Sequence, residues 1–324
     1  MLLKNLDTVA PSYICPEHGT PLDQGPEQLV CSHNHGYPVL NGVPRFVTSG
    51  YAESFGRQWQ RFRLTQLDSH TRLPLSEERL RRCLGWQALP VATKGKAILE
   101  AGCGAGRFTE VLLKITEAHV TSVDMSDAVV ANAENFPPSD RHRIAQSDIL
   151  KLPFAPRSFD YVICLGVVQH TPSPEETIRA LWDQVKPGGW LVFDHYAWGL
   201  SRLTRPAQLW RQLLKRLPEE KKLPTAEKMV DVLLPFHERH QKFGRLISRL
   251  SPVLSFYHIH PGLRPELQRE WAILDTHDTM TDHYKHLRTL GQIRRTLERF
   301  GGEQIWASKS GNGIEARIRR PEAG

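Results

Sequence analysis

The sequence predicts an α/β fold with a mostly parallel sheet, and three observations support this prediction. From Lys96 onward, short apolar runs alternate with segments whose apolar residues recur at helical spacing, as is typical of βαβ units. The chain has 324 residues, enough for one large domain with additions. Hydrophobic residues make up 40% of the chain and charged residues 24%, which is the composition of an ordinary globular protein.

The alternating region defines the expected core. Five apolar runs are expected to be strands: AILEAG, HVTSVD, RIAQSD, YVICLG and WLVFDH. The intervening segments RFTEVLLKITE, DAVVANAENF and EETIRALWDQVK are expected to be helices. The third helix should end near Lys186, with Gly188 and Gly189 turning the chain into the fifth strand. Near the C-terminus, GQIRRTLERFG predicts a helix, and EQIWAS and GIEARIRR predict two more strands.

The segments that flank this core have other sequence patterns. Residues 1–47 are turn-rich, whereas 48–95 turn helical, with Ser76 as the expected N-cap of one helix. Between 199 and 286 lie three amphipathic stretches, PAQLWRQLLKRL, TAEKMVDVLL and KFGRLISRL. Prolines are expected to break them, namely Pro218, Pro224, Pro235 and Pro252.

These differences in sequence pattern predict the domain organisation. We expect the core over 96–198, completed by 287–324. Residues 199–286 would then form a helical lid inserted into the core.

Charge and cysteine content narrow the function classes. The formal net charge of +7 suits an anionic partner without demanding one. Five scattered cysteines do not make a disulfide framework. No apolar run is long enough for a membrane span, and the start lacks the apolar region of a signal peptide, so the cytoplasm is the expected compartment.

Glycine spacing indicates the kind of cofactor. Residues 98–108 read ILEAGCGAGRF, with Gly102 and Gly104 in the turn after the first strand. Arg107 stands where the dinucleotide fingerprint would have its third glycine. The Glu100 carboxylate would oppose a pyrophosphate, but it suits a cofactor that carries an ammonium group, a second positive charge and no phosphate. The spacing therefore argues against NAD.

Two aspartates at later strand ends agree with this interpretation. Asp124 ends the second strand, where an acid can accept hydrogen bonds from both ribose hydroxyls. Asp148 follows the third strand and can accept from an exocyclic adenine amine. The fourth strand ends near Leu165, at the carboxyl edge of the sheet where open α/β folds bind ligands. Helix capping is the alternative role of the two aspartates.

Residues 96–198 resemble a class I S-adenosylmethionine-dependent methyltransferase, of the broad type 11 group. Five motifs carry the resemblance in order: LEAGCGAGRF, SVDMS, QSDILKLPF, FDYVICLGVVQHTP and VKPGGWLVF. The resemblance implies a Rossmann-like seven-stranded sheet whose last strand is antiparallel. The residues expected to bind S-adenosylmethionine are Tyr51, Gln58, Trp59, Glu100, Gly102, Gly104, Arg107, Asp124, Met125, Asp148, Ile149 and Leu165.

A narrower resemblance extends over nearly the whole chain. Methyltransferases with an ESFG-x-QW segment, here Glu53 to Trp59, also carry a WA-x-LDT stretch, here Trp271 to Thr276. The resemblance implies that Tyr51, Gln58 and Trp59 cover the cofactor while the insertion roofs the acceptor. Core packing is the alternative role of Trp59 and its apolar neighbours.

Two ligand pairs precede the core. Cys15-x2-His18 and Cys31-x3-His35 have the spacing of a small zinc ribbon. The segment resembles the ribbon of some methyltransferases, including ribosomal-RNA guanine methyltransferases, although those usually have a cysteine at the place of His18. A metal would supply folding energy to so small a module. His33 is a spare ligand, and a ribbon that packs without metal is the alternative.

An oxygen acceptor needs a general base, so histidines are the candidate catalytic residues. His170 and His195 follow the fourth and fifth strands, at the carboxyl edge of the sheet. His277 lies in WAILDTHDTMTDHY, which adds acids at Asp275 and Asp278. The alternatives are a loop-ordering role for His170, a pocket-wall role for His195, and a second metal site or an anchor at His277.

The expected function is O-methylation of a small molecule or glycan, such as a secondary metabolite or a cell-surface sugar. The alternative is an RNA methyltransferase whose ribbon and basic insertion grip phosphates. Leu165-Gly166-Val167-Val168 argues against RNA, because a base-amine motif of the Asn-Pro-Pro-Tyr type is expected there. A non-catalytic cofactor-binding subunit is a third class. A lid of this size is also compatible with a homodimer.

Overall fold

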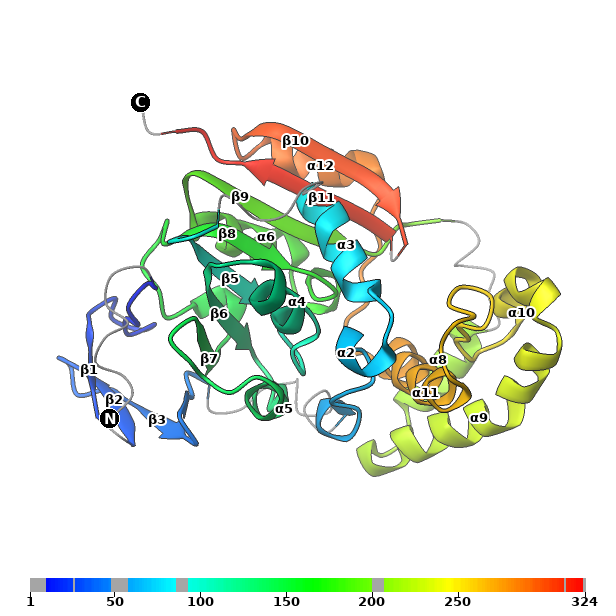
Figure 1. The fold of residues 1–324 in the computed structure, drawn as a ribbon. Coiled ribbons are helices and arrows are strands. Elements are labelled where there is room, and N and C mark those ends of the chain that lie inside the picture. Colours follow the sequence, from blue (N-terminus) through cyan, green and yellow to red (C-terminus); the bar gives the residue numbers. More distant parts are fainter. Residues whose placement is uncertain are drawn as a thin grey trace.

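A seven-stranded mixed sheet forms the centre of the computed structural model, which describes residues 10–25, 27–47, 58–85, 93–199, 207–311 and 313–322 (Figure 1). Its strand order is β10-β11-β9-β8-β5-β6-β7. The strands are β5 (Ala97–Ala101), β6 (His119–Asp124), β7 (His142–Gln146), β8 (Phe159–Cys164), β9 (Val185–His195), β10 (Glu303–Ser310) and β11 (Gly313–Arg319). β5 to β9 pair in parallel, whereas β11 is antiparallel to both of its neighbours. The predicted α/β fold, with an antiparallel last strand, is confirmed.

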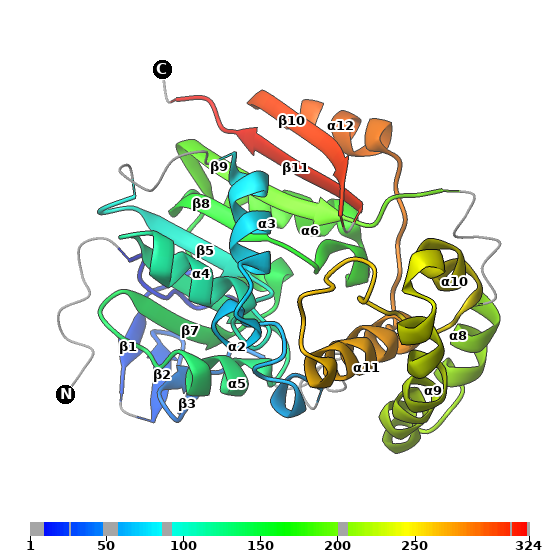
Figure 2. The ribbon, with the colours of Figure 1, turned by 45° about the vertical axis from the view of Figure 1, so that its right-hand side comes forward.

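Strand alternation divides the core between two faces of the sheet. Ile98 and Ile163 pack with α3 (Leu75–Leu84) and α4 (Arg107–Ile115) on one face. Leu99 and Val162 pack with α6 (Pro174–Asp183) and α12 (Leu290–Glu298) on the other. Figures 1 and 2 show these helix pairs on opposite sides of the sheet. Apolar residues on both faces of a strand require helices on both sides, because each face must be shielded from water.

The N-terminal part forms a second, four-stranded antiparallel sheet. Its strands are β1 (Leu22–Gln24), β2 (Gln28–Cys31), β3 (Gly36–Leu40) and β4 (Val43–Pro44). This small sheet shares the main core, since the Tyr13 and Phe154 rings lie 5.4 Å apart. The backbone N–H of Phe46 also donates to the Gln146 carbonyl of β7 at 2.8 Å. Packing of the small sheet against the main core therefore stabilises it, in addition to any contribution from a metal ion.

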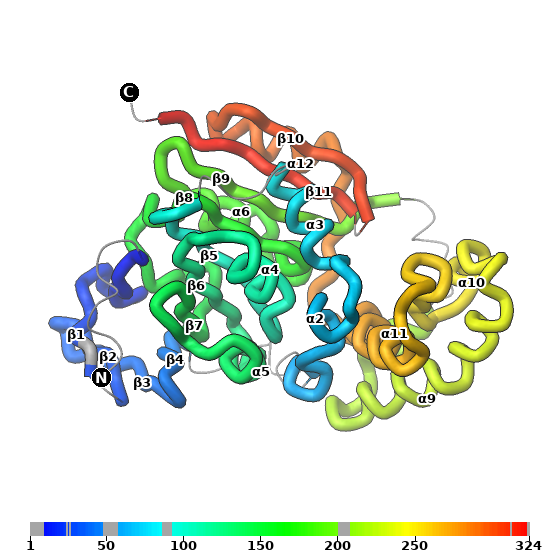
Figure 3. The backbone as a smooth tube through the Cα atoms, in the orientation of Figure 1, coloured from blue at the N-terminus to red at the C-terminus, as the bar shows by residue number. Residues whose placement is uncertain are grey.

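Four helices of the insertion lie at the end of the molecule opposite the small sheet (Figure 3). They are α8 (Ala207–Lys215), α9 (Glu219–Arg239), α10 (Gly244–Leu250) and α11 (Pro265–Thr281). The prediction that Pro224 and Pro235 break helices is wrong, because α9 runs through both. Each proline removes one helical hydrogen bond, and the burial of Val230 and Leu234 against α11 residues offsets this cost.

Two local predictions also differ from the structure. The helix α6 ends at Asp183 rather than near Lys186, and Gly188 and Gly189 lie inside β9. Ser76 is the second residue of α3, not its N-cap. The carboxylate of Asp68 accepts instead from the backbone N–H groups of Ser76 and Glu77, at 2.8 and 2.9 Å, so a side chain from the preceding α2 (Asp68–Thr71) caps the helix.

Candidate active site

A cavity of about 670 Å³ opens at the carboxyl ends of β5, β6 and β8, between the sheet and α11. Ligand pockets have volumes of about 300–1,000 Å³. Ten of the predicted cofactor residues line the cavity: Gln58, Trp59, Gly102, Gly104, Arg107, Asp124, Met125, Asp148, Ile149 and Leu165. Tyr51 lies outside the described residues. The structure thus brings together residues that lie far apart in the sequence.

The glycine loop is fixed by its backbone. Gly102 has a φ of +80°, and its N–H donates to the Val123 carbonyl of β6 at 2.7 Å. A Cβ at Gly102 would stand 2.1 Å from a methyl carbon of Val167. Only glycine has both the free φ and the missing side chain that this turn requires. The loop backbone can therefore come close to a bound molecule.

The carboxylate of Asp124 joins the loop to the end of β6. Its Oδ2 accepts from the Gly104 N–H at 2.9 Å, and Oδ1 accepts from the Ser126 N–H and hydroxyl at 2.9 and 2.7 Å. Burial raises the pKa of Asp124 above its ordinary value. Asp148 accepts from the Leu150 N–H at 2.9 Å and caps a short 3-10 helix, Ile149–Lys151. Asp148 therefore has the alternative capping role, and it also lines the cavity.

Glu100 lies beneath the glycine loop rather than in the wall of the cavity. Its side chain is 3% exposed, and Oε2 accepts from the hydroxyls of Thr109 and Ser122 at 2.5 and 2.8 Å. Its Oε1 has no hydrogen-bond partner among the described residues. Burial raises the pKa of Glu100 to about 7. A buried acceptor without a donor is costly, so a cationic group above the loop would be favourable for this carboxylate.

Arg107 ties the start of α4 to the helical segment before the core. Its Nε donates to the Ser76 hydroxyl at 2.9 Å, and Nη1 donates to Gln66 Oε1 at 3.2 Å. The guanidinium carbon lies 5.4 Å from the centre of the Trp271 ring. Burial lowers the pKa of Arg107 to about 10. These contacts give the cavity a cationic wall that connects the core to α11.

Gln58 and Trp59 have the two roles that the sequence left open. A Cβ at Gly104 would lie 3.4 Å from the Trp59 ring, so the ring covers the glycine loop. Trp59 also packs beside Phe62 in the core of the insertion. The buried amide of Gln58 donates to the Leu274 carbonyl of α11 at 3.5 Å. Cavity lining and core packing therefore coexist here.

A charged cluster around His170 also lines the cavity. His170 Nδ1 lies 3.3 Å from Asp282 Oδ2, and the His170 ring stands edge-on to Tyr196 at 5.3 Å. Asp282 is 2% exposed and also accepts from Arg211 Nε at 3.0 Å. The Lys285 ammonium lies 3.4 Å from Asp282 Oδ2. The Asp282 carboxylate is thus surrounded by cations and lies beside the imidazole, whose Nδ1 also faces the Tyr284 carbonyl at 3.2 Å.

Burial and neighbouring charges shift the pKa values of this cluster. Burial alone would lower the pKa of His170, but the nearby carboxylates of Asp278 and Asp282 outweigh it and raise the pKa. Burial raises the pKa of Tyr196 far above its ordinary range, so its phenol stays protonated. Burial lowers the pKa of Lys285. Groups with shifted pKa values that converge in a cavity are typical of active sites.

Two more carboxyl groups of α11 face the same cavity. Asp275 Oδ1 accepts from Gln66 Nε2 at 3.1 Å, and burial raises its pKa to about 7. Burial also raises the pKa of Asp278. Among the described residues, this region contains no group of three ligand atoms close enough to bind a metal ion. The structure therefore gives no support to a second metal site here.

The structure does not bring His195 and His277 into the cavity wall. His195 Nδ1 faces the Tyr196 carbonyl at 3.0 Å, and its Nε2 is buried without a partner among the described residues. His277 pairs with Gln58 Oε1 behind the lining of the cavity. Burial lowers the pKa of both histidines to about 4, so both are neutral near pH 7. Of the three candidate bases, only His170 lines the cavity.

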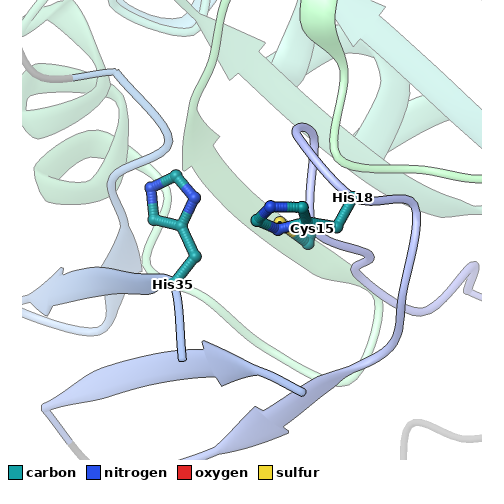
Figure 4. Close-up of side chains that lie close together, drawn as sticks. All are labelled: Cys15, His18 and His35. Atoms are coloured by element: carbon teal, nitrogen blue, oxygen red, sulfur yellow. The ribbon is translucent and has the colours of Figure 1, made fainter. Parts of the chain in front are cut away.

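The predicted metal ligands gather on the small sheet. His18 Nδ1 lies 3.3 Å from Cys15 Sγ and 3.5 Å from Cys31 Sγ. Cys15, His18 and His35 form one group whose ligand atoms lie within 4.8 Å, and His18, Cys31 and His33 form another. Figure 4 shows the His35 ring facing the Cys15–His18 pair. Two thiols and imidazoles at these distances form a donor set that suits zinc.

Sequence reasoning missed α11 as a helix and Asp282 as part of the site. α11 is buried on most sides, so its apolar residues lack the one-sided periodicity of a surface helix. A signal was present nevertheless: Asp275, Asp278 and Asp282 are spaced i, i+3 and i+7 along one helical face. Arg211 carried no comparable signal, because only the fold brings it to Asp282, whereas Lys285 lies three residues beyond Asp282 in the sequence.

Comparison with known proteins finds similarity to methyltransferases in the core of the chain. Residues 99–193 match the family model described as a methyltransferase domain. A ubiquinone biosynthesis O-methyltransferase of Pseudomonas putida is 34% identical over 114 residues, which cover 34% of this chain and 49% of that protein. A sterol 24-C-methyltransferase of Gibberella zeae is 34% identical over 108 residues, which cover 32% of this chain and 28% of that protein. The chain thus spans half or less of the length of these curated relatives.

One solved structure covers more of the chain at lower similarity. A protein of Methanococcus maripaludis, described as an S-adenosyl-L-methionine-dependent methyltransferase, aligns with 86% of this chain and 98% of its own. Sequence identity is 13% and the TM-score is 0.47.

Proposed function

We propose that this chain, which carries a class I S-adenosylmethionine-dependent methyltransferase domain over residues 99–193, methylates an oxygen atom of a small molecule or glycan. The observation that carries the proposal is the single cavity that joins the glycine loop to His170. The lining includes the groups that a sulfonium nucleoside needs and a histidine beside a buried carboxylate. A cofactor and an acceptor can therefore meet in the same cavity.

The residues around the glycine loop fit S-adenosylmethionine. When bound, this cofactor supplies an electrophilic methyl group on a sulfonium. Asp124 would hold the ribose, Met125 and Ile149 the adenine ring, and Asp148 its amine. Gly102 and Gly104 would approach the methionine end, above the unpartnered oxygen of Glu100. Binding there would stabilise an anionic Glu100 whose burial is otherwise unfavourable.

His170 is the general base of the proposal. Deprotonated His170 would take the proton of the acceptor hydroxyl as the oxygen attacks the methyl carbon. Asp282 is a positioning residue, because it lies beside Nδ1 and would fix the orientation of the ring together with the Tyr284 carbonyl, which is 3.2 Å from the same nitrogen. The carboxylate also stabilises the imidazolium that forms when the proton arrives. Tyr196, Arg107 and the acids of α11 would surround the acceptor.

Incubation with methyl-labelled S-adenosylmethionine tests this function. We would offer fractionated host extract, separated into RNA, glycolipid with polysaccharide, and polar metabolites. Label should enter the glycan or metabolite fraction, and His170→Ala protein should leave it unlabelled. Label in RNA would overturn the proposed acceptor class and support the RNA alternative. Absence of label in every fraction would contradict methyl transfer to these acceptors.

We further propose a structural zinc ion held by Cys15, His18, Cys31 and His35, with His33 as the alternative fourth ligand. Purified protein should contain about one zinc per chain, as is usual for a site of four such ligands. Cys15→Ser/Cys31→Ser protein should lose the ion, whereas Cys83→Ser protein should keep it. Zinc-free wild-type protein from zinc-supplemented medium would contradict the proposal. Because the small sheet shares the main core, zinc removal should lower Tm without unfolding the large sheet.

A further inference from the structure

The outward faces of two lid helices expose large apolar side chains. Their exposed fractions lie between 43% for Trp210 and 72% for Leu209. The residues are Leu209, Trp210 and Leu213 on α8, and Phe243, Leu246 and Leu250 on or beside α10. Scattered single apolar residues are normal on a protein surface, but a group of three on each of two helices in one part of the molecule indicates an interaction site. We call these six residues, with the basic residues between them, the docking surface.

The docking surface carries positive charge and no acid. The segments 207–217 and 240–251 contain no Asp or Glu. Apart from Arg211, which faces inward to Asp282, their basic residues are Lys215, Arg216, Lys242, Arg245 and Arg249. The helix between them, α9, contains acids at Glu219, Glu220, Glu227, Asp231 and Glu238. The charges are therefore segregated rather than mixed, as they would be on an ordinary solvated face.

The opposite sides of both helices are anchored in the protein. On α8, Leu214 is buried, and Arg211 is bound to Asp282. On α10, Gly244 is buried so close to His258 that a Cβ there would lie 2.6 Å from the histidine Cβ. The apolar residues of the docking surface thus lie on the exposed sides of helices whose other sides are packed in the protein. These exposed side chains are not needed for packing inside the chain.

The docking surface adjoins the cavity. Gln208 of α8 and Ser248 of α10 line the cavity, as does Ile259, which is itself 54% exposed. Figures 1 and 2 place α8, α9 and α10 together at the end of the molecule opposite the small sheet. A molecule that enters beside Ile259 would therefore pass between the helices that carry the docking surface.

We propose that the docking surface binds an anionic lipid bilayer, and that the acceptor is an amphiphile whose apolar part stays in that bilayer. Helices with Trp, Phe and Leu on one face and Lys or Arg beside them lie in the interface of anionic membranes. No described helix is long and apolar enough to cross a membrane, so the contact is peripheral. The statement about the acceptor rests on the proposed function, whereas the docking does not.

Charge favours a bilayer over a second copy of this chain. In a two-fold symmetric dimer, the same surface of both copies meets. Arg216, Lys242, Arg245 and Arg249 would then face their own like charges, which is unfavourable. Phosphate groups of lipids complement these cations, and the acyl region accommodates the exposed leucines. RNA would complement the charge but not the apolar side chains.

Co-sedimentation with vesicles tests the docking. The protein should bind vesicles that contain phosphatidylglycerol, bind weakly to phosphatidylcholine alone, and dissociate as salt increases. Each basic residue near an anionic surface contributes about 1 kcal/mol, so Arg245→Gln/Arg249→Gln should weaken binding roughly tenfold or more. Leu246→Ser/Leu250→Ser should also weaken it. The matched controls are Lys221→Gln/Lys228→Gln and Val232→Ser on α9, which should bind like the wild type.

Several results would overturn the proposal. One is absence of vesicle binding, and another is equal binding by the α10 variants and the α9 controls. A dimer in light scattering that needs Leu246 and Leu250 would assign the surface to self-association. Binding of RNA, but not vesicles, that needs Arg245 and Arg249 would assign it to nucleic acid. Label transfer in the absence of vesicles is measured separately, so failed docking is distinguishable from a failed methyltransferase function.

Discussion

Replacing His170 by alanine should lower kcat by about 10²–10⁴-fold, the usual contribution of a general base. The affinity for S-adenosylmethionine should stay within about twofold of wild type, because the contacts of the His170 ring are with Tyr284, Asp282 and Tyr196 rather than with the glycine loop. Single-turnover rates and calorimetric titration of the cofactor measure the two quantities separately. A variant that keeps full kcat would contradict the assignment of the base.

The pH dependence gives an independent test of His170. The base acts when deprotonated, so kcat should rise with pH through a pKa above the ordinary histidine value, because Asp278 and Asp282 raise it. Asp282→Asn removes one of these carboxylates and should move the rising limb to lower pH. It should also reduce kcat by less than His170→Ala. A merely structural role for Asp282 would leave the position of the limb unchanged.

Gly102→Ala should damage the cofactor site more than any other single methyl group added to the loop. The φ of +80° strains an alanine by about 1–2 kcal/mol. The new Cβ would also stand 2.1 Å from Val167, so the loop or Val167 must move. The free energy of unfolding should fall by about 1–3 kcal/mol beyond this strain, the usual cost of overpacking. The cofactor Kd should rise at least about tenfold, the effect of 1.4 kcal/mol.

A matched glycine separates strain from collision at this turn. Gly166 has a similar φ of +83°, but a Cβ there would meet nothing within 4 Å. Gly166→Ala should therefore lower the free energy of unfolding only by the backbone strain. Chemical denaturation of both variants measures the difference. Val167→Ala should partly restore cofactor binding to Gly102→Ala protein. Equal behaviour of the two glycine variants would show that the collision with Val167 is unimportant.

The sequence predicted the central sheet well because its periodicities are local. Apolar runs such as those of β5 and β8 lie between amphipathic helices, so each element has its own signal. The insertion was predicted less well. Pro224 and Pro235 are strong local helix breakers, but tertiary burial of Leu234 and its neighbours outweighs them in α9. Helix α11 lacked a one-sided pattern because it is buried almost throughout.

The position of the glycine loop and the strand-end acids in the cavity was also predictable, whereas the surroundings of His170 were only partly so. Glycine loops and strand-end acids recur at fixed places of a fold, and Asp124 and Asp148 line the cavity as expected. His195 was expected there too, but the strand that carries it pairs with β11 and buries the ring. Asp282 lies 3.3 Å from His170 in the structure, although more than a hundred residues separate the two in the sequence. Such pairs depend on tertiary structure and leave no local pattern.

Calorimetric titration with S-adenosylmethionine tests the central claim most directly. Wild-type protein should bind one molecule per chain, and Asp124→Ala protein should bind at least about tenfold more weakly, since a hydrogen bond to a charged group contributes about 1.5–3 kcal/mol. Asp127→Ala is the matched control, because this nearby carboxylate is 61% exposed and pairs with Arg45. It should bind like the wild type. Absence of binding to wild-type protein, or an unchanged Kd in Asp124→Ala, would contradict the cofactor site described above.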